Sequence, residues 1–457
     1  MIKYCAVVAI VVILTSCGGT GEQKQDANAF QVPVEYYKLP NGLKVVLSKD
    51  TTAPTVCVAI YYNIGFRIEP KDRTGFAHLF EHMMFQGSEN LGKNEFAKLV
   101  QQNGGVFNGS TRFDFTNYFE VMPSHKLETA LWAEGDRMKG LAITQDNLTN
   151  QQGVVKSEVK VNVLNQPYGG FPWLDMPQYA NKNWYNAHNF YGDLAHLDSA
   201  KLEDVDKFFK TFYAPNNAVL AVVGDFEEAD AKKWIEQYFG PLKASELPPK
   251  PDISEPKQEA EQSFHKSDTL APKPAIAVAY KMPERNTPDY YAMGLIDQLL
   301  VQGQDSKLIV KLTQEKGYTG NVFGGINYLG NMYNYNGPMV WMSNLTYDAT
   351  ISPDSIVKVF DQAINELSSV TQEEVDLAIV KLRSDLYSNV SNSFGTADLL
   401  ASFALFDDDP SRINTLESEF RRVTPEQIKK TVAEYLRPTN RTILIVDPRK
   451  TEQTAKL

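Results

Sequence analysis

The sequence predicts an α+β fold made of two similar halves, and three observations support this prediction. Short strand-like apolar runs are interleaved with longer segments of helical periodicity. A predicted helix, a Pro-x-Asn turn and a buried strand follow one another at residues 202–223, and the same order recurs at residues 426–446. Between these copies, residues 245–262 are rich in Pro and Glu, which is typical of a linker. We therefore expect each half to contain an antiparallel sheet flanked by helices.

The first half starts with a predicted β-hairpin. Its turn, Pro40-Asn41-Gly42, contains the Asn-Gly pair that accepts the positive φ values of a tight turn. Cys57 lies in a strand-like run and is expected to be a buried structural thiol. Strands are predicted, in order, at residues 34–39, 43–47, 55–62, 106–111, 115–121 and 218–223. Helices are predicted at residues 94–102, 127–141, 146–163 and 202–213, and an irregular segment rich in Gly, Pro and aromatic residues at 168–191.

The second half shows the same mixture of elements. A helix is expected to begin at Thr371, because Thr371 and Glu374 have the spacing of a capping box, in which each side chain bonds the other's backbone N–H. Strands are predicted at residues 275–280 and 442–446, and further helices at residues 290–301, 306–314 and 426–436.

One short segment places two of the chain's six histidines around a glutamate. His78 and His82 are four residues apart in an apolar, helix-compatible run, so on a helix they lie one turn apart on the same face, with Glu81 beside them. Neutral imidazoles suit zinc, and a neighbouring carboxylate can act as the general base of a hydrolase. The segment predicts a catalytic metal site. The alternative is a buried helix whose histidines are satisfied by hydrogen bonds.

Length and composition limit the possible functions. A chain of 457 residues is too long for one core, so two or more domains are expected. Its apolar fraction of 43% and charged fraction of 22% are those of a soluble globular protein. The net charge of −11 argues against nucleic acid as a partner, because neutralising phosphates requires clustered Lys and Arg.

The amino terminus has the features of a bacterial lipoprotein signal. Lys3 precedes an apolar run at residues 6–14 that is too short to span a bilayer comfortably, and Leu14-Thr15-Ser16-Cys17 resembles a lipobox. We expect residues 1–17 to be a signal peptide ending at the lipidated Cys17, and residues 18–30 to be a flexible tether. The body would then face the periplasm from a lipid anchor, with the outer membrane favoured. The alternative is an uncleaved membrane anchor.

The chain resembles the inverted-zincin peptidases of the pitrilysin, insulysin and mitochondrial processing peptidase family. The resemblance extends over nearly everything after about Gln31. It implies a catalytic half at residues 31–244, a linker at 245–265 and a non-catalytic half at 266–457, which together form part of a clamshell chamber. The segments that carry it stand in family order at residues 65–90, 103–123, 130–138, 154–170 and 208–226.

The resemblance implies a set of site residues. Glu158, 76 residues after His82, would be the third ligand of one Zn²⁺ per chain. Taken alone, Glu158 is an exposed helix charge. Gln151 stands where several relatives have an outer-shell glutamate that tunes the metal. His188 and His196 are ligands only in principle, because their spacing of eight matches no recognised metal pattern, and both are expected to be structural.

The resemblance also implies how substrate binds. In the family an edge strand, here residues 106–111, pairs with the extended substrate backbone, which makes Asn108 and Gly109 the expected substrate-binding residues. Taken alone, Asn108 is better explained as a turn residue. Peptides or unfolded segments are therefore the expected substrates of a zinc endopeptidase.

The second half departs from the family pattern. Family members that act alone carry there an arginine, and a tyrosine seven residues later, that approach the substrate, whereas Thr313 and Gly320 stand at those positions here. Tyr318 could substitute only if the loop shifted by two residues. We therefore expect the zinc-bearing subunit of a heterodimer whose second subunit supplies Arg and Tyr. The rivals are a non-catalytic binding or scaffold subunit that retains zinc, and an assembly factor whose histidines are structural.

Overall fold

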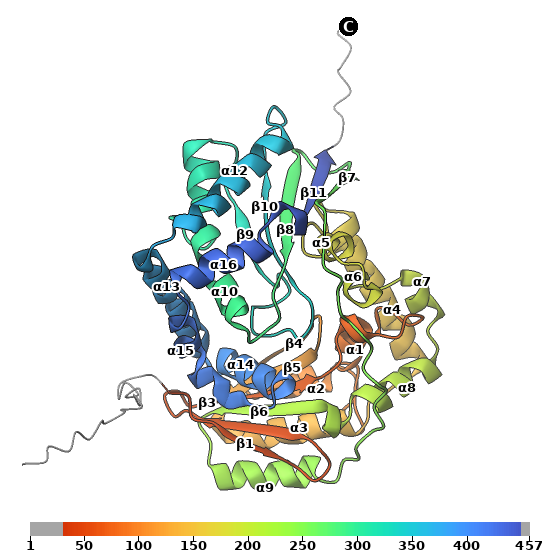
Figure 1. Cartoon of the computed structure of the whole chain (residues 1–457). Coiled ribbons are helices and arrows are strands. Elements are labelled where there is room, and N and C mark those ends of the chain that lie inside the picture. Colours follow the sequence, from red (N-terminus) through yellow and green to blue (C-terminus); the bar gives the residue numbers. More distant parts are fainter. Residues whose placement is uncertain (1–30, 449–457) are drawn as a thin grey trace, which may run out of the picture. The chain divides into compact units, whose positions relative to one another are not determined.

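The computed structural model describes residues 31–448, which contain two β-sheets with helices packed against them (Figure 1). The first sheet has six strands in the order β1-β2-β6-β3-β5-β4. All six coincide with the predicted strands to within a few residues. Their bounds are β1 Glu35–Lys38, β2 Lys44–Lys49, β3 Thr55–Tyr62, β4 Val106–Thr111, β5 Thr116–Pro123 and β6 Ala218–Gly224.

The predicted hairpin is confirmed. Strands β1 and β2 pair in antiparallel fashion, with Lys38 opposite Lys44, and Gly42 in the turn has a φ of 92°. A side chain at Gly42 would also collide with Asn216, because an added Cβ would lie 2.8 Å from the Asn216 Cβ. Both the left-handed backbone and the close contact therefore require glycine at this turn.

The second sheet repeats the order of the first without its extra hairpin strand. Its five strands run β7-β11-β8-β10-β9, which matches β2-β6-β3-β5-β4 strand for strand. Strands β8 and β11 were predicted, whereas β7, β9 and β10 were not. The bounds are β7 Gln262–Asp268, β8 Ala275–Lys281, β9 Phe323–Ile326, β10 Val340–Thr346 and β11 Arg441–Pro448. The internal repeat inferred from sequence thus corresponds to a repeat of topology.

The expectation of purely antiparallel sheets is wrong, because each sheet contains one parallel pair. Strand β6 pairs parallel with β2 and antiparallel with β3, and β11 pairs parallel with β7 and antiparallel with β8. The cause is topological. A late strand that inserts between two neighbours of opposite direction must run parallel to one of them.

The predicted helices of the first half are present, and α5, α6, α7 and α9 are additional. The segment at residues 168–191, predicted to be irregular, contains the short helices α5 and α6, and α4 continues into a π-helical turn at Lys160–Leu164. The bounds are α1 Phe76–Met83, α2 Glu95–Gln102, α3 Leu127–Lys139, α4 Gln145–Val159, α5 Asp175–Ala180, α6 Trp184–Ala187, α7 Leu194–Ser199, α8 Leu202–Phe212 and α9 Glu228–Phe239.

In the second half the capping box is confirmed at the start of α13. Thr371 Oγ1 accepts from the Glu374 N–H at 3.3 Å, and Glu374 Oε2 accepts from the Thr371 N–H at 2.9 Å. The helices are α10 Pro288–Leu300, α11 Lys307–Ile309, α12 Pro353–Glu366, α13 Gln372–Val390, α14 Ser393–Phe406, α15 Leu416–Arg421 and α16 Pro425–Tyr435.

The two halves share contacts although their sheets are separate. Residues 32–448 lie in one compact unit, and helix α14 of the second half packs against β3 and β6 of the first sheet. The connection between α9 and β7 has no helix or strand, and β7 begins at Gln262, inside the predicted linker. Cys57 is a buried free thiol, as predicted.

Within residues 31–448, no helix is both long and apolar enough to cross a bilayer. The predicted signal peptide (1–17) with Cys17 and the predicted tether (18–30) lie outside the described residues.

A hydrogen bond between the halves gives a stability test. The Tyr61 hydroxyl donates to Asp398 Oδ1 at 2.8 Å, and burial raises the pKa of the Asp398 carboxyl. We expect Tyr61→Phe to lower the free energy of unfolding by about 1–3 kcal/mol, because a buried carboxyl loses a donor. Tyr37→Phe is the matched control, since the Tyr37 hydroxyl is buried without a partner among the described residues. Equal urea midpoints for the two variants would contradict this prediction.

Candidate metal centre

Helix α1, which carries the motif, begins at a buried carboxylate. Gly75 adopts a left-handed conformation (φ 83°) at the helix start. Glu69 accepts hydrogen bonds from the N–H groups of Gly75 (2.9 Å) and Ala77 (2.6 Å). These first-turn N–H groups have no partner within the helix, and they lie at the positive end of its dipole. Burial raises the pKa of Glu69, while hydrogen bonding to His188 acts in the opposite direction.

Helices α1 and α4 pack together and bring the three predicted ligands to one point. His78 Nε2 and His82 Nε2 lie 3.3 Å apart. Glu158 Oε2 lies 3.2 Å from His82 Nε2 and 3.6 Å from His78 Nε2. Among the described residues, these three form the one group of His, Cys, Asp or Glu donors close enough to share a metal ion.

These separations fit a tetrahedral metal ion. Zinc bonds of about 2.0–2.2 Å arranged as a tetrahedron place the ligand atoms about 3.3–3.6 Å apart. The observed separations of 3.2, 3.3 and 3.6 Å agree with this spacing. Two imidazoles and one carboxylate also leave a fourth position open, which is the arrangement of catalytic rather than structural zinc sites.

The surroundings set the ligands in the protonation states that metal binding needs. Burial lowers the pKa of His78 to about 4, partly opposed by the charge of Glu158. For Glu158, burial acts to raise the pKa, but hydrogen bonds from His82 and Tyr191 and the charges of the two histidines outweigh it and lower the pKa overall. A neutral imidazole and an ionised carboxylate therefore face the site.

Glu81 lies on α1 next to the three ligands. Burial raises the pKa of Glu81, and the charge of Glu158 adds to this increase. Hydrogen bonding to Thr111 and the charge of His82 act in the opposite direction. A half-buried carboxylate with increased proton affinity beside a candidate metal position is suited to general-base chemistry.

Sequence reasoning missed Tyr191. Its hydroxyl donates to Glu158 Oε1 at 3.2 Å, which leaves Oε2 directed at the histidines, and its ring meets the His78 ring at 5.1 Å. Tyr191 belongs to the segment treated as irregular, so no local pattern connected it with Glu158. Its aromatic neighbour Phe190 also contacts His78.

His188 and His196 lie outside the three-ligand group, as predicted. His188 Nε2 lies 2.6 Å from the Phe66 carbonyl oxygen, and its ring stacks on Trp184. His196 Nδ1 lies 2.8 Å from Thr74 Oγ1.

Gln151 is buried on α4, and its amide nitrogen donates to Asn150 Oδ1 at 2.8 Å. No hydrogen bond in the described part of the chain joins Gln151 to the three ligands. Its outer-shell role therefore stays a prediction.

Strand β4 is the edge of the first sheet, as expected for a peptide-binding strand. It pairs only with β5 and packs beside α1, where Thr111 Oγ1 donates to the Ala77 carbonyl oxygen at 3.3 Å. Asn108 is exposed, and its Oδ1 accepts from the Gly109 N–H at 2.9 Å. An unpaired edge next to the motif helix is open to strand addition. The contact of Asn108 and Gly109 with substrate stays a prediction.

In the second half, Thr313 and Gly320 offer no counterpart to an arginine and a tyrosine. Thr313 lies in the π-helical segment Val310–Glu315 that follows α11, and its hydroxyl donates to the Ile309 carbonyl oxygen at 2.6 Å. Gly320 has no side chain, and no atom lies within 4 Å of the position that a Cβ would take.

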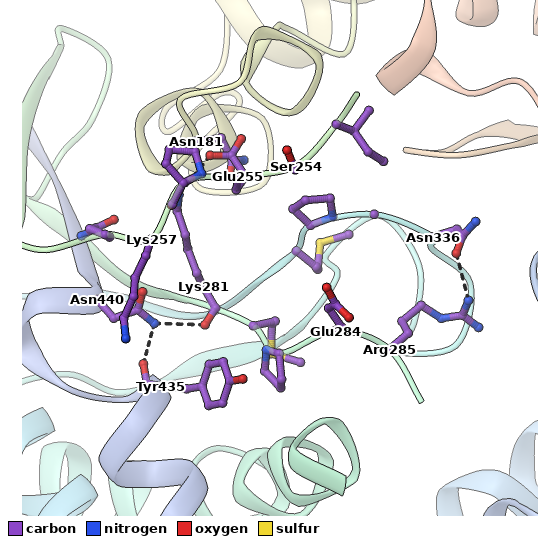
Figure 2. A pocket seen from close by; sticks show the side chains of 18 of the residues that line it. Asn181, Ser254, Glu255, Lys257, Lys281, Glu284, Arg285, Asn336, Tyr435 and Asn440 are labelled. Atoms are coloured by element: carbon purple, nitrogen blue, oxygen red, sulfur yellow. Dashed lines mark hydrogen bonds and ion pairs between the residues drawn. The ribbon is translucent and has the colours of Figure 1, made fainter. Parts of the chain in front are cut away.

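A cavity of about 820 Å³ lies elsewhere, beside residues 251–258 of the connecting segment (Figure 2). Three of its lysine and arginine side chains are paired with carboxylates: Lys257 with Glu434, Lys281 with Glu255 and Arg285 with Asp407, each at 3.0 Å. None of the three predicted metal ligands lines this cavity. This cavity is therefore not part of the candidate metal site.

The fold and the site together define a class: an α+β protein of two topologically repeated halves, of which one carries two histidines and a glutamate close enough to share a metal ion. Comparison with protein families agrees. A sequence model described as "Insulinase (Peptidase family M16)" matches residues 44–183, and one described as "Peptidase M16 inactive domain" matches residues 199–382. The chain belongs to peptidase family M16, which confirms the family inferred from its motifs.

Individual relatives cover most of the chain. It is 26% identical to "Zinc protease PqqE" of Helicobacter pylori over 91% of this chain and 93% of that protein. It is 22% identical to "Uncharacterized zinc protease YmxG" of Bacillus subtilis over 64% of this chain and 69% of that protein. A crystal structure of a protease from Helicobacter pylori superimposes with a TM-score of 0.84 at 25% identity, covering 91% of this chain and all of that one.

Metal binding can be tested directly. We expect His82→Ala and Glu158→Ala to weaken zinc binding by more than about 100-fold, since removing even an outer-shell partner costs about 10–100-fold. His265→Ala is the control, because His265 is exposed and paired with Asp447. Competition with a chromophoric chelator measures the affinity. Unchanged affinity in both ligand variants would exclude this site.

Proposed function

We propose that this chain is a zinc-dependent endopeptidase in which His78, His82 and Glu158 hold the metal. The observation that carries the proposal is the approach of three donor atoms to 3.2–3.6 Å, with Glu81 on the same helix as two of them. The names of the zinc protease relatives support it. A bound zinc ion would act as a Lewis acid that polarises the scissile carbonyl and lowers the pKa of water.

In this proposal Glu81 is the group that moves protons. Its carboxylate takes a proton from the water that attacks the peptide carbonyl and then gives a proton to the departing amide nitrogen. Tyr191 keeps Glu158 oriented by donating to Oε1. The cap supplied by Glu69 fixes the start of the helix that carries Glu81.

Peptides or unfolded segments are the proposed substrates. Strand β4 has a free edge, so an extended backbone can pair with it at Asn108 and Gly109. Folded proteins rarely offer such a segment, because their strands are already paired. Main-chain pairing would bind many sequences with similar strength.

We further propose that this chain works with a second family subunit. A missing donor to the developing oxyanion costs on the order of 100-fold or more in rate. Thr313 cannot supply the positive charge of the family's arginine, and Gly320 cannot supply the phenolic hydroxyl of its tyrosine. A partner would therefore contribute the Arg and Tyr. In the cell, the chain would be held to the envelope by a lipid on Cys17 and would face the periplasm, most simply from the outer membrane.

A second candidate function is a non-catalytic scaffold subunit that retains zinc. The description "inactive domain" for the match at residues 199–382 favours it. A structure of complex III2 from Candida albicans shares the fold alone, with a TM-score of 0.73 at 15% identity. The complete ligand group and the free edge of β4 favour the peptidase.

The role of Glu81 can be separated from metal binding. Glu81→Gln keeps the size of the side chain but removes the base, so we expect zinc content to be unchanged and peptide cleavage to fall by about 100-fold or more. Glu203→Gln is a matched control on an exposed helix position. Cleavage of an unstructured peptide and bound zinc are measured in the same samples. Full activity in Glu81→Gln would remove Glu81 from the mechanism.

The need for a partner can also be tested. The chain from Gly18 onward is expected to bind one zinc ion and to cleave peptides at least about 100-fold more slowly alone than with a second M16 subunit that carries the Arg and Tyr. Values of kcat/KM with and without that subunit, together with the mass of the species in solution, decide the matter. Brisk cleavage by a monomer would show that the chain is self-sufficient.

A further inference from the structure

Large apolar side chains that remain exposed in the first half gather on two elements. Among the described residues up to 244, they are Val106 (64% exposed) on β4, Val154 (39%) on α4, and Val161 (56%) and Leu164 (63%) on its π-helical continuation. Both elements pack against α1, the motif helix. Single exposed apolar residues need no explanation, but a cluster confined to the elements beside one site indicates a binding surface.

The residues Val154, Val161 and Leu164, which we call the apolar rim, flank the metal ligand Glu158. Val154 precedes Glu158 by four residues and Val161 follows it by three, which are the spacings of side-chain neighbours on a helix. Leu164 lies three residues further along, at the end of the π-helical turn. The apolar rim therefore lies beside the three-ligand group on the helix that carries Glu158.

The rim is not explained by packing within the chain. Helix α4 already buries a complete inward face through Leu148, Val155 and Val159. Val161 and Leu164 are more than half exposed, so they contribute little to that core. Their neighbours Lys160 and Asn162 are exposed polar residues. Burial in the core therefore does not explain why residues 161 and 164 are apolar.

We propose that the apolar rim binds an apolar side chain of the peptide substrate next to the cleaved bond, so that the enzyme selects hydrophobic segments from unfolded chains. This inference rests on the proposed peptidase function and adds its substrate class. Main-chain pairing with β4 supplies affinity without sequence preference, and the rim supplies the preference. Val106, exposed on β4 itself, extends the same apolar character to the strand side of the site.

The test uses a double variant with a matched control. Val161→Asn/Leu164→Asn makes the rim polar, while Leu247→Asn/Leu270→Asn changes two exposed leucines that lie outside the first half, in the connecting segment and after β7 (38% and 48% exposed). Thermal unfolding of both variants checks that they fold, and their midpoints are expected to match the parent because all four positions are exposed. The assays use the chain loaded with zinc, together with the second subunit if cleavage requires one.

Mass spectrometry first locates the bond that is cleaved in an unstructured peptide. Two quantities are then measured on a pair of such peptides, which differ only in having Leu or Asn next to that bond. The first is kcat/KM. The second is binding to the Glu81→Gln background, measured by fluorescence anisotropy without turnover. The rim variant is expected to lose about tenfold in kcat/KM and in affinity for the Leu peptide only. The control variant should change neither.

Equal losses for both peptides, or none, would overturn the inference. A rim variant that instead changes the oligomeric state, with unchanged peptide selectivity, would show that the rim contacts another protein chain. If the parent chain cleaves nothing, the proposed function fails, yet the anisotropy comparison still decides whether the rim selects apolar peptides.

Discussion

The candidate site depends on the packing of α4 against α1. Two histidines one turn apart on α1 can bind an ion only weakly by themselves, and the third donor comes from a helix that follows much later in the chain. The buried face of α4 shares a core cluster with Leu79, Phe80 and Met83 of α1. Hydrophobic burial, which is not directional, thus sets the distance between α1 and α4. That distance allows the three ligand atoms to approach one another.

A repeated topology with an unrepeated site explains the asymmetry of the chain. The strands β7-β11-β8-β10-β9 copy β2-β6-β3-β5-β4, so the second half has the scaffold needed to present a site. Its described residues nevertheless contain no second group of metal-binding donors. Folding constrains the apolar pattern of both halves equally, whereas the ligands are a few polar residues that one half can lose without cost to its core.

Whether a structural feature could be predicted from the sequence depended on how far apart its residues lie along the chain. The hairpin at Asn41-Gly42 and the cap at Thr371 are determined by residues a few positions apart, and both were predicted correctly. His78, Glu81 and His82 share one helix, so their proximity followed from helical geometry, while Glu158 needed the family resemblance. Tyr191 and Glu69 escaped because each meets its partner through tertiary packing, and no local pattern encodes such contacts.

The contacts between the halves bear on how substrate reaches the site. Arg67 is fully buried, bonds Asp114 through Nε at 2.7 Å and donates to the Pro338 carbonyl oxygen of the second half at 3.0 Å. Asp114 in turn accepts from the Asn336 N–H at 2.7 Å. Separating the halves would leave the Arg67–Asp114 pair intact but would remove these two hydrogen bonds to it, and hydrogen bonds to charged groups are worth about 1.5–3 kcal/mol each. The halves are therefore held together by directional hydrogen bonds to a buried ion pair as well as by the packing of α14, and a relative movement of the halves would have to break these bonds.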